Sequence, residues 1–291
     1  MTDFFNNSSI LLKNLLNEPF GRYSGLVNCL KAVLLAKINY KKAFFIVSTE
    51  QKALQYKADL ETLFGIEAHI FPPQEISPYE LLDRNKFQYS QQIKTIVEEP
   101  KLVIAPVKSL LEKFPSKEFL NQNKINIKKE EEIEPKKLGK KLVNLCYKRV
   151  TMVNDVGEFS IRGDIIDIYP LCYEPVRIEL WGDEVVDIRN FDIKTQRSYQ
   201  KLEEFSIYPL YKFILKDEEL ISEGIEFFEN EHNPELKSIF EVLSKDYTII
   251  FDESAEIESK IAFWEENFNK YYQNNLKNEL VPPLKKMNHL G

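Results

Sequence analysis

An aspartate and a glutamate, Asp252 and Glu253, directly follow an apolar run at residues 247–251. Nucleotide hydrolases hold Mg²⁺ with carboxylates at such a strand end. They also need a G-x-x-x-x-G-K-[ST] loop, whose backbone N–H groups and lysine cradle the phosphates. The sequence contains no such loop, and residues 19–26, where it would stand, include no lysine. The pattern therefore favours carboxylates at a strand end or helix cap, and we expect no bound ATP or Mg²⁺.

Other catalytic and metal-binding patterns are missing as well. The sequence has no C-x-x-C, H-E-x-x-H, G-x-S-x-G or G-x-G-x-x-G. Its three cysteines and three histidines are far apart, which excludes a disulfide framework and disfavours a His-rich metal site. Cys172 stands near Pro170, and nothing in the sequence suggests a histidine partner, so we expect a loop or buried thiol. We predict no catalytic residue and no metal ligand.

Charge is distributed unevenly along the 291 residues. The net charge is −7, but residues 121–150 carry nine Lys or Arg against four Glu, and residues 201–291 carry ten Lys against 19 Asp or Glu. The acidic last third disfavours a dedicated DNA-binding protein, because such proteins present a basic face to the phosphates. The lysine-rich stretch is typical of a solvated linker or helix face, although weak DNA binding along 124–149 stays open.

The sequence shows no sign of membrane insertion or export. No apolar run is long enough to cross a membrane, and the first nine residues lack the basic segment of a secretory signal. Three cysteines in 291 residues fit a reducing compartment. We therefore expect a cytoplasmic protein without membrane contact.

Strand and helix patterns alternate in both outer parts of the chain. Short apolar runs at 43–47, 66–71 and 102–105 predict buried strands, separated by helical patterns at 10–39, 51–63, 87–97 and 107–114. The mixed pattern returns with a helix at 234–243, a strand at 247–251 and a helix at 255–272. Such alternation is typical of an α/β fold with a parallel sheet.

A different pattern fills the middle of the chain. Residues 117–141 are mostly polar and charged and indicate a boundary. Period-two strands at 159–162, 165–169, 176–181 and 185–191 end at turn residues and predict an antiparallel meander. We therefore predict one α/β domain in two parts, 1–122 and 209–291, interrupted by a β-rich insertion at 123–208.

The meander carries the most specific signal. Its segments G-E-F-S-I-R-G-D-I-I-D-I-Y-P (157–170) and P-V-R-I-E-L-W-G-D-E (175–184) closely resemble the domain shared by the repair protein UvrB and the bacterial transcription-repair coupling factor (Mfd). In both families this domain binds UvrA. The resemblance is strong over 142–200, where 147–159 also resembles the coupling factor, and looser elsewhere. The segments at 71–80 (F-P-P-Q-E-I-S-P-Y-E) and 103–115 resemble the coupling factor in particular, as do 224–228 and 280–284.

The resemblance favours the coupling factor over UvrB. UvrB has an intact phosphate-binding loop and a Tyr-rich β-hairpin that wedges DNA strands, and neither is present here. The resemblance spans nearly the whole chain but covers only the family's N-terminal UvrB-like module. It implies a degenerate P-loop-NTPase-like α/β domain, with the polymerase-binding and ATP-driven motor domains outside this chain. We therefore expect a fragment or truncated product that has no cofactor of its own.

The family's UvrA contact uses two strand arginines and an aromatic residue, which correspond here to Arg162, Arg177 and Trp181. Trp181 stands where the family usually has Phe, and Asp164 resembles UvrB rather than the coupling factor. Residues 177 and 181 share a strand face, and arginine and tryptophan are frequent at interface hot spots. The plainer alternative is a surface Arg–Glu pair beside a half-buried Trp.

The resemblance implies a catalytically inert adaptor that binds UvrA and brings it to stalled RNA polymerase, in competition with UvrB. RNA polymerase and DNA are then partners only through the missing domains. Two alternatives stay open. One is an ATP-dependent DNA translocase or helicase, which is the activity of the full-length family protein. The other is a direct DNA-binding module.

Overall fold

The computed structural model describes residues 29–74, 86–212 and 236–277, together with residues 21, 26 and 214. The chain divides into two compact units, each assembled from separate segments. Unit 1 comprises residues 1–73, 98–111 and 243–271, and unit 2 comprises residues 74–97, 112–242 and 272–291. The expected domain bounds at 1–122, 123–208 and 209–291 stay a prediction.

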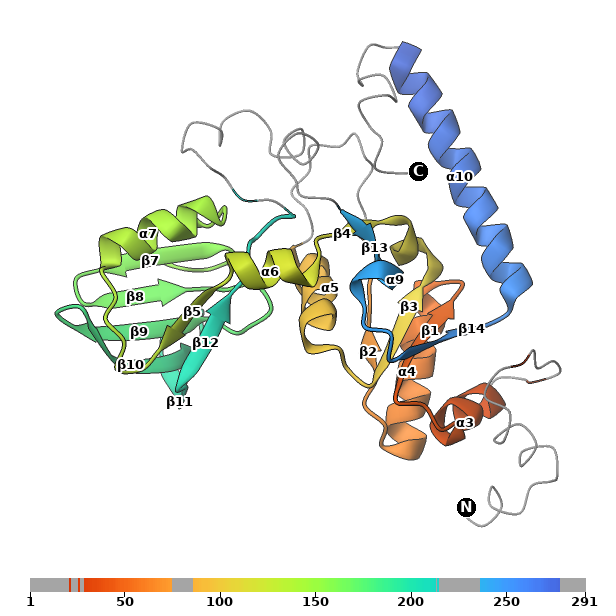
Figure 1. Cartoon of the computed structure of the whole chain (residues 1–291), viewed down its shortest axis with the longest axis horizontal. Helices are drawn as coiled ribbons and strands as arrows, with labels where there is room; N and C mark the ends of the chain where they lie inside the picture. Colours follow the sequence, from red (N-terminus) through yellow and green to blue (C-terminus); the bar gives the residue numbers. More distant parts are fainter. Residues whose placement is uncertain are drawn as a thin grey trace. The chain divides into compact units, whose positions relative to one another are not determined.

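Unit 1 is built on a four-stranded parallel sheet with the strand order β14-β1-β3-β2 (Figure 1). The apolar runs of β1 and β3 are almost entirely buried, as central parallel strands require. The expected parallel α/β fold is therefore confirmed. Its elements are α3 (Cys29–Lys37), β1 (Lys42–Val47), α4 (Glu50–Phe64), β2 (His69–Ile70), β3 (Leu102–Pro106), η1 (Val107–Leu111), β14 (Tyr247–Phe251) and α10 (Ser254–Lys277).

The helix α4 shows how local sequence sets an element of unit 1. Thr49 caps its first turn by accepting a hydrogen bond from the Lys52 backbone N–H, and Gly65 ends it in the left-handed conformation at φ 63°. Its buried face, Ala53, Tyr56 and Leu60, packs with the side chains that β1 directs to the same side of the sheet. The expected helix at 51–63 is confirmed.

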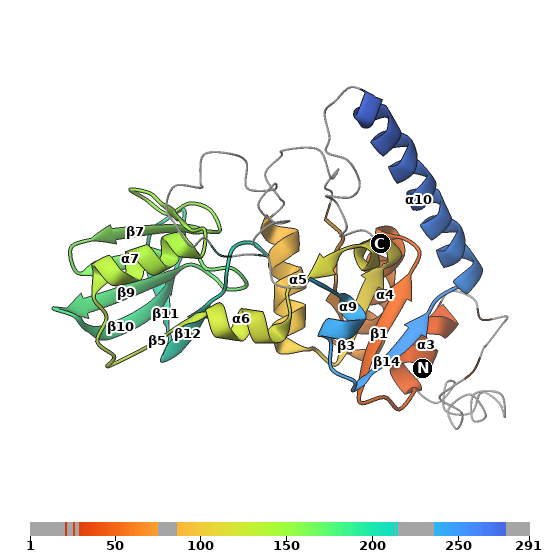
Figure 2. The ribbon, with the colours of Figure 1, turned by 45° about the horizontal axis from the view of Figure 1, so that its top comes forward.

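Unit 2 contains a six-stranded sheet with the order β11-β10-β9-β8-β7-β6 (Figures 1 and 2). Strands β7 to β11 pair with their sequence neighbours in antiparallel fashion, and only β6 pairs in parallel with β7. The antiparallel meander is therefore confirmed. Its strands are β6 (Lys148–Arg149), β7 (Glu158–Arg162), β8 (Ile165–Ile168), β9 (Val176–Trp181), β10 (Glu184–Phe191) and β11 (Ser198–Lys201).

The polar stretch at 117–141 is folded, and its place as a domain boundary stays a prediction. It forms α6, β5 and the start of α7, and its sparse apolar side chains, such as Ile127 and Leu138, are buried. The lysines of α7 face solvent, so the helix-face interpretation of this charge run is confirmed and the linker interpretation is wrong. Helix α7 packs on β6 and β7. The elements here are α6 (Lys117–Asn123), β5 (Ile125–Lys128) and α7 (Pro135–Asn144).

Apart from α5, the remaining elements are short. The predicted helix at 107–114 is a 3-10 turn followed by β4, and the helix predicted at 234–243 is only one turn long where the structure describes it. The pattern at 10–28 lies largely outside the described residues. Within the described residues, no helix is both long and apolar enough to cross a membrane. The elements are α5 (Lys86–Glu98), β4 (Lys113–Phe114), β12 (Glu204–Ile207), β13 (Lys237–Ser238) and α9 (Ile239–Val242).

Candidate functional site

Strand β9 separates a core face from an outer face of the meander. Val176, Ile178 and Leu180 are buried, whereas the alternate residues Arg177 and Trp181 lie on the opposite side. This alternation follows from the two-residue period of a β-strand. The shared face that the sequence predicts for these two site residues is therefore confirmed, and we call it the outer face of the meander.

A buried carboxylate lies on the same face. Asp167 of β8 stands directly opposite Arg177 of β9 in the antiparallel register, and its side chain is 1% exposed. Arg177 donates to it twice, from Nε to Oδ1 at 2.6 Å and from Nη2 to Oδ2 at 2.9 Å. Arg162 Nη2 also donates to Oδ2, at 2.6 Å. The structure thus brings together two of the three predicted site residues on one aspartate.

Arg177 contacts three residues of the meander: Asp167, Gln196 and Phe191. Besides its fork on Asp167, Nη1 donates to the Gln196 carbonyl oxygen at 3.1 Å, and the guanidinium lies 4.9 Å from the centroid of the Phe191 ring. The hydrogen bonds to Asp167 outweigh burial and raise the pKa of Arg177 above its ordinary value. The Arg177 side chain is only 16% exposed, so most of it is buried against the sheet.

Arg162 and Trp181 are far more accessible. The Arg162 side chain is 49% exposed, and Trp181, the last residue of β9, is 80% exposed. Of the plainer alternative, the surface Arg–Glu pair is present, but between Glu179 and Arg189, whereas the half-buried Trp is wrong. Arg177 pairs with Asp167, and Trp181 projects from the surface. Glu179 instead lies 3.7 Å from Arg189.

Sequence reasoning missed Asp167. The only signal in the sequence was an aspartate between isoleucines in the strand I-I-D-I. The pairing of β8 with β9 places this aspartate directly opposite Arg177. A buried carboxylate needs counter-charges and hydrogen-bond donors, so its position predicts a cationic partner on a neighbouring strand. The arginine that pairs with Asp167 is decided by the pairing register of β8 and β9, and this register cannot be predicted from the local sequence.

The carboxylates at the end of β14 are already paired within the chain. Asp252, whose side chain is 2% exposed, accepts a hydrogen bond from Lys31 Nζ at 2.7 Å, and Lys31 also contacts Glu253 at 2.6 Å. Lys52 lies 3.7 Å from Asp252 and bonds to Glu256. The sequence led us to expect solvated carboxylates or helix caps. Asp252 is buried instead, because Lys31 and Lys52 provide its counter-charge.

The pKa of Lys31 reflects this pairing. Burial by itself would lower it, but the hydrogen bonds to Asp252 and Glu253 together raise the pKa above its ordinary value. Among the described residues, no group of three or more His, Cys, Asp or Glu side chains is placed to hold a metal ion.

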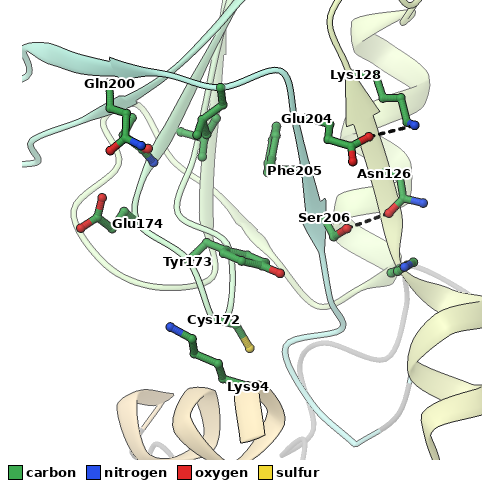
Figure 3. A pocket seen from close by; sticks show the side chains of 14 residues that line it. Lys94, Asn126, Lys128, Cys172, Tyr173, Glu174, Gln200, Glu204, Phe205 and Ser206 are labelled. Carbon is green, nitrogen blue, oxygen red and sulfur yellow. Dashed lines mark hydrogen bonds and ion pairs between the residues drawn. The ribbon is translucent and has the colours of Figure 1, made fainter. Parts of the chain in front are cut away.

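A cavity of about 620 Å³ lies in unit 2, beside the paired strands β5 and β12 (Figure 3). Lys94 of α5 reaches toward its wall at Cys172 and Tyr173 (Figure 3). Cys172 is a buried loop thiol, as expected, and its backbone N–H donates to Ser90 Oγ at 2.9 Å. The lining is mixed in charge. It comprises Lys94, Lys124, Asn126, Lys128, Cys172, Tyr173, Glu174, Val176, Asn190, Gln200, Leu202, Glu204, Phe205 and Ser206.

The cavity does not present a strongly basic surface. Two glutamates line it with its three lysines, and Lys128 is paired with Glu204 at 2.8 Å. Nucleic-acid backbones bind where several cations neutralise successive phosphates. DNA binding along 124–149 therefore gains no support here and stays a prediction. Of the other resembling segments, 75–80, 224–228 and 280–284 lie outside the described residues.

Comparison with known proteins gives two kinds of similarity. The sequence model of the UvrB interaction domain matches residues 125–213. The transcription-repair-coupling factors of Staphylococcus aureus (strain bovine RF122 / ET3-1) and Staphylococcus haemolyticus (strain JCSC1435) are each 33% identical to this chain, over 217 and 215 residues. Each alignment covers 70% of this chain and 18% of the relative, so the chain spans less than a fifth of these relatives' length.

Proposed function

Because residues 125–213 belong to the UvrB interaction domain family, and most of the chain is related to transcription-repair-coupling factors, we propose that it is a non-catalytic adaptor of transcription-coupled excision repair. Its task is to bind UvrA through the outer face of the meander. Arg162, Arg177 and Trp181 are the residues on which this binding depends.

The observation that carries the proposal is the outer face itself. An 80% exposed tryptophan at the end of β9 lies on the same sheet face as two arginines that meet on one buried aspartate. A highly exposed tryptophan near an accessible arginine is typical of an interface, because interfaces concentrate their binding energy in Trp and Arg. Arg162, whose side chain is 49% exposed, is the arginine of this face that can reach a partner carboxylate, which a guanidinium binds through two parallel hydrogen bonds.

The non-catalytic part of the proposal rests on the nucleotide position of unit 1. The sequence has no phosphate-binding loop, and the carboxylates at the end of β14 are paired with Lys31 and Lys52. A Mg²⁺ ion at Asp252 would meet two ammonium groups, because Lys31 bonds to Oδ1 and Lys52 lies 3.7 Å from Oδ2. We therefore propose that the chain binds neither ATP nor Mg²⁺.

The remaining steps of coupling lie outside the chain. Relatives named transcription-repair-coupling factor are more than five times as long as the aligned segment. Under this proposal, contact with RNA polymerase and movement along DNA belong to the other parts of such proteins. This chain contributes the recruitment of UvrA to a stalled polymerase.

Titration against purified UvrA tests the proposal. We expect binding in the micromolar range or tighter, weakened roughly fivefold or more by Arg162→Ala and by Trp181→Ala. Arg149→Ala, an exposed arginine of β6, and Leu54→Ala, a 61% exposed leucine of α4, are the matched controls and should bind like wild type. Added UvrB should compete for UvrA.

Three results would contradict the proposal in different ways. No binding to UvrA would overturn the partner. Binding that neither variant weakens would keep the partner and overturn the face. Saturable heat of ATP binding in calorimetry, with Mg²⁺ present, would overturn the non-catalytic assignment.

A further inference from the structure

We infer that the three predicted contact residues do not act alike: Arg162 and Trp181 meet the partner, whereas Arg177 stays within the sheet and, with Asp167, positions Arg162. The inference rests on the proposed function, because it assigns roles within the same face. It also adds one contact, Ile165, that the family resemblance did not bring in.

The donors of Arg177 are already in use. A guanidinium has five N–H donors, and here Nε and Nη2 bond to Asp167, Nη1 bonds to the Gln196 carbonyl, and Nη2 lies 3.5 Å from Gln196 Oε1. Its planar face is covered on one side by Phe191. To bind a partner carboxylate through its Nε–Nη2 fork, Arg177 would have to leave Asp167 as a buried charge with a single remaining counter-ion, which is costly.

Arg162 is in the opposite situation. Within the described residues its side chain makes one hydrogen bond, from Nη2 to Asp167, and about half of it is exposed. Two arginines on one carboxylate leave one net positive charge, and the more exposed arginine is the one that can present it. Asp167 thereby fixes one end of a flexible side chain, which lowers the entropy lost when a partner binds the rest.

The register places Ile165 between the two exposed anchors. Arg162 is directly opposite Ile165, Ile165 is directly opposite Glu179, and Glu179 lies two residues from Trp181 on the same strand. Directly opposed and diagonal neighbours on one sheet face are within reach of each other's side chains. Arg162, 37% exposed Ile165 and Trp181 therefore form one oblique strip across β7, β8 and β9. Glu179, which lies beside this strip, is 3.7 Å from Arg189. The strip fits a partner that offers a carboxylate to Arg162 and an apolar recess to the indole.

Asp167→Asn gives the sharpest test, because two explanations predict opposite changes in the affinity for UvrA. If the face acted only through its net charge, removing a negative charge would strengthen binding to an acidic partner. If Asp167 positions Arg162, the variant should bind UvrA roughly fivefold to tenfold more weakly. Arg177→Lys should weaken binding similarly although it keeps the charge, because an ammonium cannot reproduce the fork.

Arginine modification by phenylglyoxal, mapped by mass spectrometry, provides a readout that needs no partner. In the free wild-type chain Arg162 should react readily and Arg177 slowly. In Asp167→Asn, Arg177 should become reactive. When UvrA is bound to the wild type, Arg162 should be protected. Modification of Arg177 as fast as that of Arg162 in the free chain would overturn the division of roles.

A substitution at the exposed residue Ile165 tests the same inference if the Asp167→Asn variant does not fold. Ile165→Asp changes an exposed side chain and should abolish most UvrA binding, whereas Met152→Asp, a 46% exposed residue of unit 2, should not. Wild-type binding of UvrA that Asp167→Asn and Ile165→Asp leave unchanged would overturn this inference and keep the proposed function. Absence of UvrA binding by the wild type would overturn both.

Discussion

Lys31 Nζ lies 2.7 Å from Asp252 Oδ1, although 221 residues separate them in the sequence. Lys52 and Glu256 add a second link between the same regions, and Ser48 Oγ donates to Glu256 at 2.8 Å. The helices α3 and α4 are thereby tied to the end of β14 and the first turn of α10. This cluster joins the N-terminal and C-terminal segments of unit 1 around the position where a nucleotide hydrolase would hold its metal.

Removing Lys31 should destabilise unit 1. Lys31→Met leaves Asp252 buried with only the more distant Lys52 nearby, and we expect the free energy of unfolding to fall by about 2–3 kcal/mol. Urea denaturation followed by Trp264 fluorescence in a Trp181→Phe background reports this unit. Lys41→Met removes an exposed pair with Asp246 and should cost less than about 0.5 kcal/mol. Equal losses from the two variants would contradict the role of burial.

The stability of unit 1 should fall in acid through Glu256. The hydrogen bonds from Lys52 and Ser48 lower the pKa of Glu256 below its ordinary value of 4.5. A carboxylate with a lowered pKa in the folded state stabilises above pH 4.5, and this contribution is lost as the pH falls through the folded-state value. Urea midpoints measured across this range should decline less steeply in Lys52→Met, because that variant has already lost most of the contribution.

The parts of the fold that the sequence predicts well share one property. In β1 and β3, and in β7 to β10, the apolar pattern and the strand coincide, because each strand buries one or both faces. The sequence pattern predicts no elements at 117–141, because the few buried residues there, such as Ile127 and Leu138, stand among lysines and glutamates that cover the surface. The charged side chains of this stretch lie on its exposed side, whereas its few apolar side chains pack into the core and determine the fold.

The candidate face was predictable only in part. The arginines and the tryptophan came from resemblance, and strand parity placed Arg177 and Trp181 on one face. The opposing position of Asp167 depends on the pairing register of β8 and β9, which turn geometry and the burial of the other face set together. A reader of the sequence could suspect that Asp167 needs a cation, but could not choose among Arg162, Arg177 and Arg189.

Tyr147 should be important for the stability of unit 2. Its buried hydroxyl donates to the Tyr208 carbonyl oxygen at 3.0 Å and accepts from the Leu171 N–H at 2.9 Å. Tyr147→Phe leaves both backbone groups without this partner, and we expect a loss of about 1–3 kcal/mol in urea denaturation. Tyr199→Phe is the matched control, because its hydroxyl bonds to the exposed Glu174 carboxylate rather than to buried backbone groups. A smaller loss for Tyr147→Phe than for Tyr199→Phe would contradict the prediction.

Gly157 should tolerate alanine less well than Gly163, although both adopt positive φ angles, 83° and 58°. A Cβ atom at Gly157 would lie 2.4 Å from Leu210 Cδ2, whereas a Cβ at Gly163 meets nothing within 4 Å. Gly163→Ala should therefore cost only the backbone strain, about 1–2 kcal/mol. Gly157→Ala adds the displacement of a buried leucine and should cost about 2–4 kcal/mol. Equal unfolding free energies for the two variants would show that Leu210 moves aside freely, and Gly157→Ala combined with Leu210→Ala separates the clash from the strain.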